Sequence, residues 1–175
     1  MDKKYKVKIT ALLYEELTRD VEAWKIAAYI YDQVRMELKS GKDFEIDDIL
    51  AGLVEFWNMD AEVMNGGYSQ CFFNGYAKNP VYIKAFLKFL GNKNILKNFE
   101  AAHGVYKANK ANFEKERKGQ WSDFQDIVEN PDLAELKRLS SEYYVIGNNL
   151  YEEIRQKIVE NKDVFFLGDK IRGWK

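Results

Sequence analysis

The feature that most constrains this fold is the spacing of apolar residues, which recur every three or four positions along most of the chain. The first stripe, in the segment 20–39, comprises Val21, Trp24, Ala28, Tyr31, Val34 and Leu38. The second, in the segment 46–64, comprises Ile46, Ile49, Leu50, Leu53, Trp57, Ala61 and Met64. Residues three and four apart share one face of an α-helix, so each stripe predicts an amphipathic helix. Similar spacing predicts further helices at 68–76, 80–90, 93–116, 131–145 and 150–158.

The sequence therefore predicts an all-α fold, a single compact domain of roughly seven helices. A chain of 175 residues suits one domain with one core. Only residues 4–9, KYKVKI, alternate with period two, which predicts a short strand or an extended N-terminal arm. We divide the chain into an N-terminal arm or first turn at 1–19, a helical domain at 20–166 and a C-terminal tail at 167–175.

The composition predicts a soluble protein of the cytoplasm. Hydrophobic residues make up 46% of the chain and aromatic residues 15%, which is enough material for a core. A single Cys gives no internal disulfide, and the charged start MDKKYKVKIT lacks the apolar run of a signal peptide. No apolar stretch approaches the roughly 20 residues of a membrane span. We therefore expect no membrane partner.

Charge is segregated along the sequence although the net charge is only −1. Residues 10–62 contain thirteen Asp and Glu against five Lys and Arg, whereas residues 76–118 contain ten Lys and Arg against three Glu. Two interpretations stay open: two oppositely charged faces, or two segments that pack together and neutralise each other.

The residue types of most catalytic and metal sites are scarce. One Cys and one His cannot form a zinc cluster, and no Gly-rich phosphate loop occurs, so we expect no metal and no cofactor. Gly67-Tyr-Ser-Gln-Cys71 resembles a nucleophile elbow, but a helix precedes it where an elbow needs a strand. We interpret Cys71 as a core residue and the Glu100–His103 step as a hydrogen-bonded pair. The sequence assigns no catalytic residue and favours a protein that is not an enzyme.

The segment 62–75, EVMNGGYSQCFFNG, predicts a break between two helices. Asn and Gly adopt left-handed backbone angles that most residues avoid, so Asn65 and the two glycines after it can end one helix and redirect the chain. We expect Gln70 to bond backbone groups freed by the break, and Glu62 to accept from backbone N–H groups at the next helix start. The alternative is a pocket for a small molecule or a partner. Its candidate residues are Glu62, Asn65, Gly66, Gly67, Gln70, Phe73 and Asn74.

The stretch 53–79, LVEFWNMDAEVMNGGYSQCFFNGYAKN, resembles a bacterial helical family that is catalogued as a domain of unknown function and named after a DNA-mimic protein. The family hallmark is E-x-x-N-G-G followed by an aromatic, a Gln, paired aromatics and Asn. A weaker similarity to the closing helices of the family covers 133–165. The resemblance implies an all-α fold, a homodimer and no established enzymatic activity. For the naming member it also implies an acidic surface that imitates DNA and occupies a DNA-binding transcription regulator.

Three functional hypotheses follow. The first is a non-enzymatic protein-binding module that engages a protein partner, such as a DNA-binding regulator, through its acidic N-terminal third. The candidate face for that partner is Asp43, Glu45, Asp47 and Asp48, with further candidate acids at Glu15, Glu16, Asp20, Glu22, Asp32 and Glu37. The second is a small-molecule or enzymatic site at the Asn-Gly-Gly break. The third is non-specific nucleic-acid binding by the lysines of 76–118, which the isoelectric point near 6.0 disfavours.

Overall fold

A computed structural model describes residues 4–41, 45–77, 80–115 and 120–168. The helices are α1 (Ala11–Arg19), α2 (Trp24–Lys39), α3 (Asp48–Phe73), α4 (Pro80–Leu90), α5 (Lys93–Ala108), α6 (Lys110–Glu114), α7 (Trp121–Val128), the 3₁₀ helix η1 (Pro131–Leu133), α8 (Ala134–Ile146), α9 (Leu150–Glu160) and α10 (Lys162–Phe165). The strands are β1 (Val7–Ile9) and β2 (Phe166–Gly168). Within the described ranges, eight α-helices have eight residues or more. The prediction of a compact all-α fold is confirmed.

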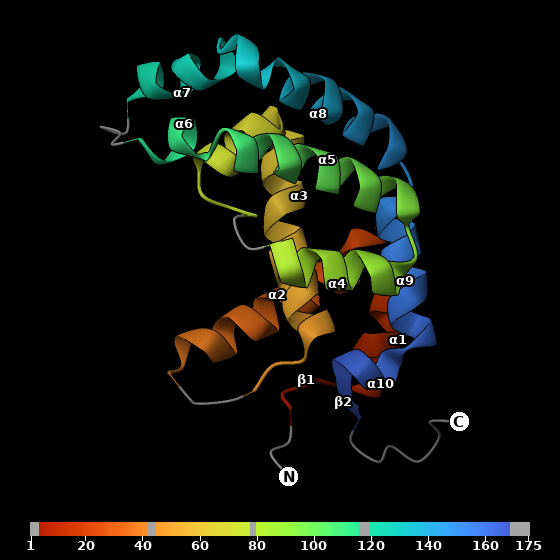
Figure 1. Cartoon of the computed structure of the whole chain (residues 1–175). Coiled ribbons are helices and arrows are strands. Elements are labelled where there is room, and N and C mark those ends of the chain that lie inside the picture. The colour runs from red at the N-terminus through yellow and green to blue at the C-terminus, as the bar shows by residue number, and fades with distance from the viewer. Residues whose placement is uncertain (1–3, 42–44, 78–79, 116–119, 169–175) are drawn as a thin grey trace.

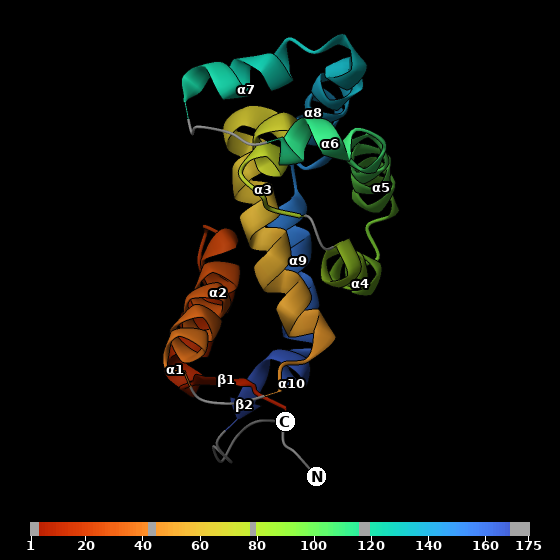
Figure 2. The same ribbon diagram turned by 60° about the vertical axis from the view of Figure 1, so that its left-hand side comes forward.

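The long helix α3 forms the centre of the molecule, and the other helices pack around it. It contacts α2, α4 and α8, while α5 packs on α8 and α2 packs on α9. Figures 1 and 2 show α7 across the end at which α3 finishes, and the two strands at the opposite end. The approach of α3 to α4 is close because Gly52 has no side chain: a Cβ there would lie 2.4 Å from the Tyr82 carbonyl oxygen.

The segment 4–9 forms a strand because a second strand from the other end of the chain pairs with it. β1 and β2 are parallel, with Val7 opposite Phe166 and Ile9 opposite Gly168. Val7 and Ile9 are buried, so the apolar half of the alternation faces the core. Residues 11–19, which we expected within an arm or first turn, form α1, a helix that contains no fully buried residue. The division of the chain into arm, domain and tail stays a prediction.

The buried face of α2 differs from the expected stripe. Its buried residues are Ile26, Ala27, Ile30 and Val34, so of the predicted stripe only Val34 is buried. Val21 is 96% exposed and Leu38 is 53% exposed. This segment has apolar residues on two faces of the helix. The face with the aliphatic residues Ile26, Ile30 and Val34 packs into the core. Tyr31 packs at the half-buried edge instead, with its ring centroid 5.8 Å from that of Trp57.

Two predicted helix boundaries also differ. The expected helices at 46–64 and 68–76 are the two parts of α3, which is interrupted at Gly66 and Gly67. Its inner face is Leu50, Leu53, Phe56, Met59 and Val63, whereas Met64 is 57% exposed. The expected helix at 93–116 ends at Ala108, and the short helix α6 follows Asn109.

Candidate functional site

The break in α3 is a change of backbone direction at two adjacent glycines. Gly66 has φ −153° and ψ 21°, and Gly67 has φ 78° and ψ −179°. The positive φ of Gly67, combined with its extended ψ, belongs to a region of backbone space that is essentially restricted to glycine. The sequence places glycine where this conformation occurs, which confirms the expected helix break.

Helix α8 supplies hydrogen-bond partners to backbone groups on both sides of the break in α3. The backbone N–H of Tyr68 donates to Ser140 Oγ over 2.9 Å, and Ser140 Oγ donates to the Leu136 carbonyl over 2.7 Å. On the other side of the break, Tyr144 Oη donates to the Val63 carbonyl over 2.9 Å. A Cβ on Gly67 would lie 2.8 Å from Ser140 Oγ. The break is therefore shaped to fit one turn of α8.

The polar residues of the hallmark motif bond to each other across the break. Gln70 Nε2 donates to Glu62 Oε2 over 3.0 Å, and Asn74 Nδ2 donates to the same oxygen over 2.8 Å. The expectation that Glu62 and Gln70 bond freed backbone groups is thus corrected, since α8 fills that role. Asn65 is exposed beside this cluster, and Phe73 packs against Phe124 with ring centroids 5.3 Å apart. That the motif residues line a pocket stays a prediction.

A buried network, which sequence reasoning missed, lies next to the break. Tyr143 Oη donates to Asp60 Oδ1 over 2.6 Å, and Tyr151 Oη donates to Asp60 Oδ2. Asp60 is only 4% exposed, and this burial raises the pKa of its carboxyl group, although the two tyrosine hydrogen bonds act in the opposite direction. A signal was available, because Asp60 follows Phe56 by four positions and precedes Val63 by three. It is therefore an acid on the inner face of α3.

Three side chains that the sequence analysis considered for chemistry, those of Cys71, Glu100 and His103, lie in or against the packed helices. Cys71 is fully buried, as expected, and this burial raises the pKa of its thiol. His103 lies among aromatic rings, 5.8 Å from the ring centroid of Tyr106. Glu100 forms an ion pair with Lys84 over 3.2 Å. Among the described residues, no three His, Cys, Asp or Glu side chains gather closely enough to hold a metal ion.

The middle of the chain matches a known protein family. The model of the DMP19-like protein family matches residues 45–161, which is two thirds of the chain and includes the break and the α8 turn that holds it. The chain belongs to the DMP19-like family. No curated protein and no solved structure matches it. The family region starts just before α3, so β1, α1 and α2 lie outside it.

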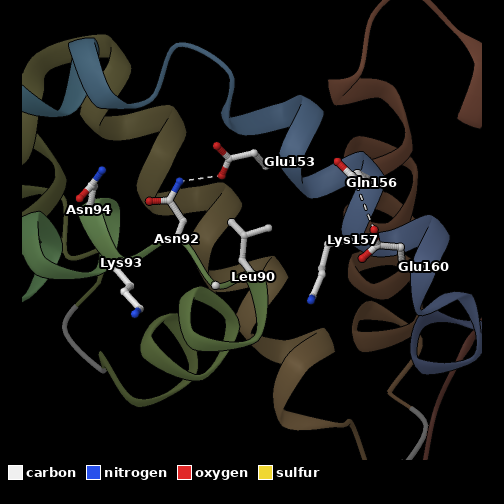
Figure 3. Close-up of a pocket in the computed structure, with 9 residues that line it drawn as sticks. Leu90, Asn92, Lys93, Asn94, Glu153, Gln156, Lys157 and Glu160 are labelled. Atoms are coloured by element: carbon white, nitrogen blue, oxygen red, sulfur yellow. Dashed lines mark hydrogen bonds between the residues drawn. The ribbon is translucent and has the colours of Figure 1, made fainter.

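A cavity of about 600 Å³ in this DMP19-like protein lies between the α4–α5 connection and α9. Figure 3 shows two pairs of polar side chains in its wall: Asn92 donates to Glu153 over 2.7 Å, and Gln156 donates to Glu160 over 3.0 Å. The Lys157 ammonium lies 5.3 Å from the Phe89 ring centroid. Because these groups already satisfy one another, we assign no ligand to this cavity.

The acidic residues predicted as a partner face have different roles at the start of α3. Asp47 is the N-cap of α3: its carboxylate accepts from the Ile49 N–H over 2.9 Å and lies 3.3 Å from the Lys4 ammonium. Glu45 is exposed, and its carboxylate lies 4.0 Å from the same ammonium. Asp48 is also exposed, and Asp43 falls outside the described residues. Lys4, which belongs to neither of the two charged segments, therefore partly neutralises the acids at the start of α3.

The lysine-rich segment shows the same local pairing. Besides the pair of Lys84 with Glu100, Lys110 lies 3.3 Å from Glu114.

Among the described helices of this DMP19-like protein, none is long and apolar enough to cross a membrane.

Proposed function

We propose that this DMP19-like protein is a non-enzymatic module that binds a protein partner through its acidic N-terminal third. The observation that carries the proposal is that exposed carboxylates and exposed apolar side chains both occur along residues 12–48, on α1, on α2 and in the segments just before α2 and α3. The exposed acids are Glu15, Glu16, Glu22, Asp32, Glu45 and Asp48. The exposed apolar residues include Leu12, Val21, Trp24 and Met36. Charged and apolar groups side by side are typical of protein-binding surfaces.

The partner that such a surface fits is a protein with a cationic face. DNA-binding regulators present Lys and Arg side chains to phosphates, and exposed carboxylates can occupy those side chains instead. The exposed apolar residues would add contacts that a phosphate backbone lacks, so the partner surface should combine basic and apolar residues. A DNA-binding regulator is therefore our candidate partner class.

The structure also identifies which acids are not free to contribute. Asp60 is buried, and Glu62 accepts two amide hydrogen bonds. Asp20 and Glu22 both pair with Lys25, over 3.0 and 2.8 Å, so Glu22 is exposed but also paired. Asp47 caps α3, so its replacement would change the helix as well as the surface. Glu45 and Asp48 are the acids of the predicted face that a binding experiment should reverse.

The test is capture of partners from a lysate of the native organism at low salt, followed by elution with duplex DNA. We expect a defined DNA-binding protein to be retained by the wild-type chain and released by the DNA. The double substitution Glu45→Lys with Asp48→Lys should abolish this retention. The matched control is Asp126→Lys with Glu129→Lys, which reverses two exposed acids on and just after α7 and should leave retention unchanged.

Two results would contradict the proposal. One is equal retention by the Glu45/Asp48 variant and the wild type, which would show that this face is not used. The other is retention that duplex DNA does not reverse, which would exclude a partner held through its DNA-binding surface.

A further inference from the structure

A second cleft, of about 470 Å³, lies between α5 and α8, away from the acidic N-terminal third. It adjoins the cavity of Figure 3, since Asn94 lines both. Its wall on α5 includes Lys97, Asn98 and Ala101, and its wall on α8 includes Arg138, Leu139 and Glu142. The two helices pack directly on each other, so the cleft is a depression along their seam. It combines a polar floor, apolar walls and a charged rim.

The floor contains a buried amide that has hydrogen-bonding capacity left. Asn98 is 3% exposed; its Oδ1 accepts from Tyr68 Oη over 2.8 Å, and its Nδ2 donates to the Leu139 carbonyl over 3.0 Å. A primary amide has two N–H donors and two carbonyl lone pairs, and these bonds use one of each. The other N–H is a nearly buried donor in a residue that lines a cleft, and a buried donor without an acceptor is costly. An acceptor in the cleft would remove that cost.

One side chain of the rim can pair with an acceptor that carries negative charge. Lys97 is exposed on the α5 side. On the α8 side, Arg138 donates to Glu135 over distances of 2.6 to 3.0 Å and to Glu142 over 3.2 Å. These bonds orient the guanidinium, and the two carboxylates more than neutralise its charge. Lys97 is then the principal cation for an anionic group, while Ala101 and Leu139 offer apolar contact.

We propose that the α5–α8 cleft binds a small organic carboxylate. The carboxylate accepts the remaining N–H of Asn98 and pairs with Lys97, and the carbon skeleton packs against Ala101 and Leu139. This site does not depend on the protein-binding function proposed above, since it uses other residues on other helices. It does connect to the helix break, because the Tyr68 hydroxyl donates to Asn98 and the Tyr68 N–H is held by Ser140.

The experiment is an NMR titration of the full chain, labelled with ¹⁵N, with acetate, succinate and benzoate, each compared with its neutral amide. At least one carboxylate should give saturable shifts of the Asn98 side-chain amide and of the Ala101, Leu139 and Tyr68 backbone amides, with a Kd of about 1 mM or tighter. Acetamide, succinamide and benzamide should shift these signals far less. Shifts at Tyr68 would report the connection from the cleft to the break.

Two tryptophan variants separate the cleft from the rest of α5. Ala101→Trp fills the cleft from an exposed position and should weaken binding of the responding carboxylate by about tenfold or more, as expected for loss of the contact surface. Ala108→Trp, at another exposed alanine of the same helix and outside this cleft, should leave the Kd unchanged. The proposal is overturned if no carboxylate shifts these signals at 20 mM, or if Ala101→Trp binds as tightly as the wild type.

Discussion

The two ends of α3 use polar residues in opposite ways. At the C-terminal end, the hallmark residues are bonded inside the molecule: Glu62 holds Gln70 and Asn74, while α8 satisfies the backbone around Gly67. At the N-terminal end, only Asp47 is required by the helix, and Asp48 beside it is exposed. The first region is a joint that positions helices, and the second is a surface that a partner can reach.

This difference gives the distinctive motif a structural role in joining helices. The Ser, Cys and Gln of GYSQC stand beside glycines, but the glycines serve a change of direction and the Cys is buried. The less distinctive acids of α1, α2 and the α3 start remain available for contact. The following substitutions test whether the two ends of α3 differ as described.

Gly67→Ala should give the largest effect, because it disturbs the joint in two ways. The backbone conformation of Gly67 disfavours any side chain, and the new Cβ would lie 2.8 Å from Ser140 Oγ. We expect a loss of about 2–5 kcal/mol in the free energy of unfolding, measured by urea denaturation. Gly104→Ala is the matched control, since nothing lies within 4 Å of its Cβ position in α5, and it should stabilise the helix by about 0.5–1 kcal/mol. A neutral Gly67→Ala variant would contradict the account of the break.

Ser140→Ala should cost about 1–3 kcal/mol, because it leaves the buried N–H of Tyr68 without its acceptor. Ser141→Ala is the natural comparison: Ser141 makes the same type of hydrogen bond to a carbonyl four residues earlier, but it is exposed. Its effect should stay within about 0.5 kcal/mol. Equal unfolding midpoints for the two variants would mean that α8 does not hold the break.

The fold was largely predictable because most helices carry one clear apolar stripe. The helix at 80–90 and the break at Gly66–Gly67 follow directly from local sequence. The buried face of α2 was assigned incorrectly because Ile26 and Ile30 lie on a different face from Trp24 and Ala28, and periodicity alone does not say which face meets α3. The partner of β1 was also hidden, since β2 lies more than 150 residues away and pairing over that distance leaves no local signal.

The candidate site was predictable in its residues but not in its bonds. The motif drew attention to Glu62 and Gln70, yet their mutual contact depends on the exact turn of the chain at Gly67. Ser140 and Tyr144, which complete the break, come from a helix some 70 residues later and have no distinguishing pattern. Asp60 could have been found, as an acid in the middle of an apolar stripe.

The buried Asp60 predicts a pH dependence on the joint side of α3. Burial raises the pKa of Asp60 in the folded chain above its ordinary value in the unfolded chain. Protonated Asp60 is therefore favoured by folding, and its contribution to stability is complete below the ordinary pKa and is lost as the pH rises through the folded value. The stability of the wild type relative to Asp60→Asn, measured by urea unfolding from about pH 4 to about pH 7, should fall with rising pH. A relative stability that rises instead would mean that the hydrogen bonds from Tyr143 and Tyr151 outweigh burial.

The smallest effects should separate the two adjacent acids at the start of α3. Asp47→Ala removes the N-cap acceptor of the Ile49 N–H and should cost about 1 kcal/mol. Asp48→Ala removes only a favourable charge in the first helical turn and should cost about 0.3–0.5 kcal/mol. Partner retention should show the reverse order, because Asp48 is exposed whereas Asp47 is tied to Ile49 and Lys4. The contrary result is that Asp47→Ala weakens retention of the partner more than Asp48→Ala when the two variants are equally stable. In that case the exposed acids do not form the surface that contacts the partner.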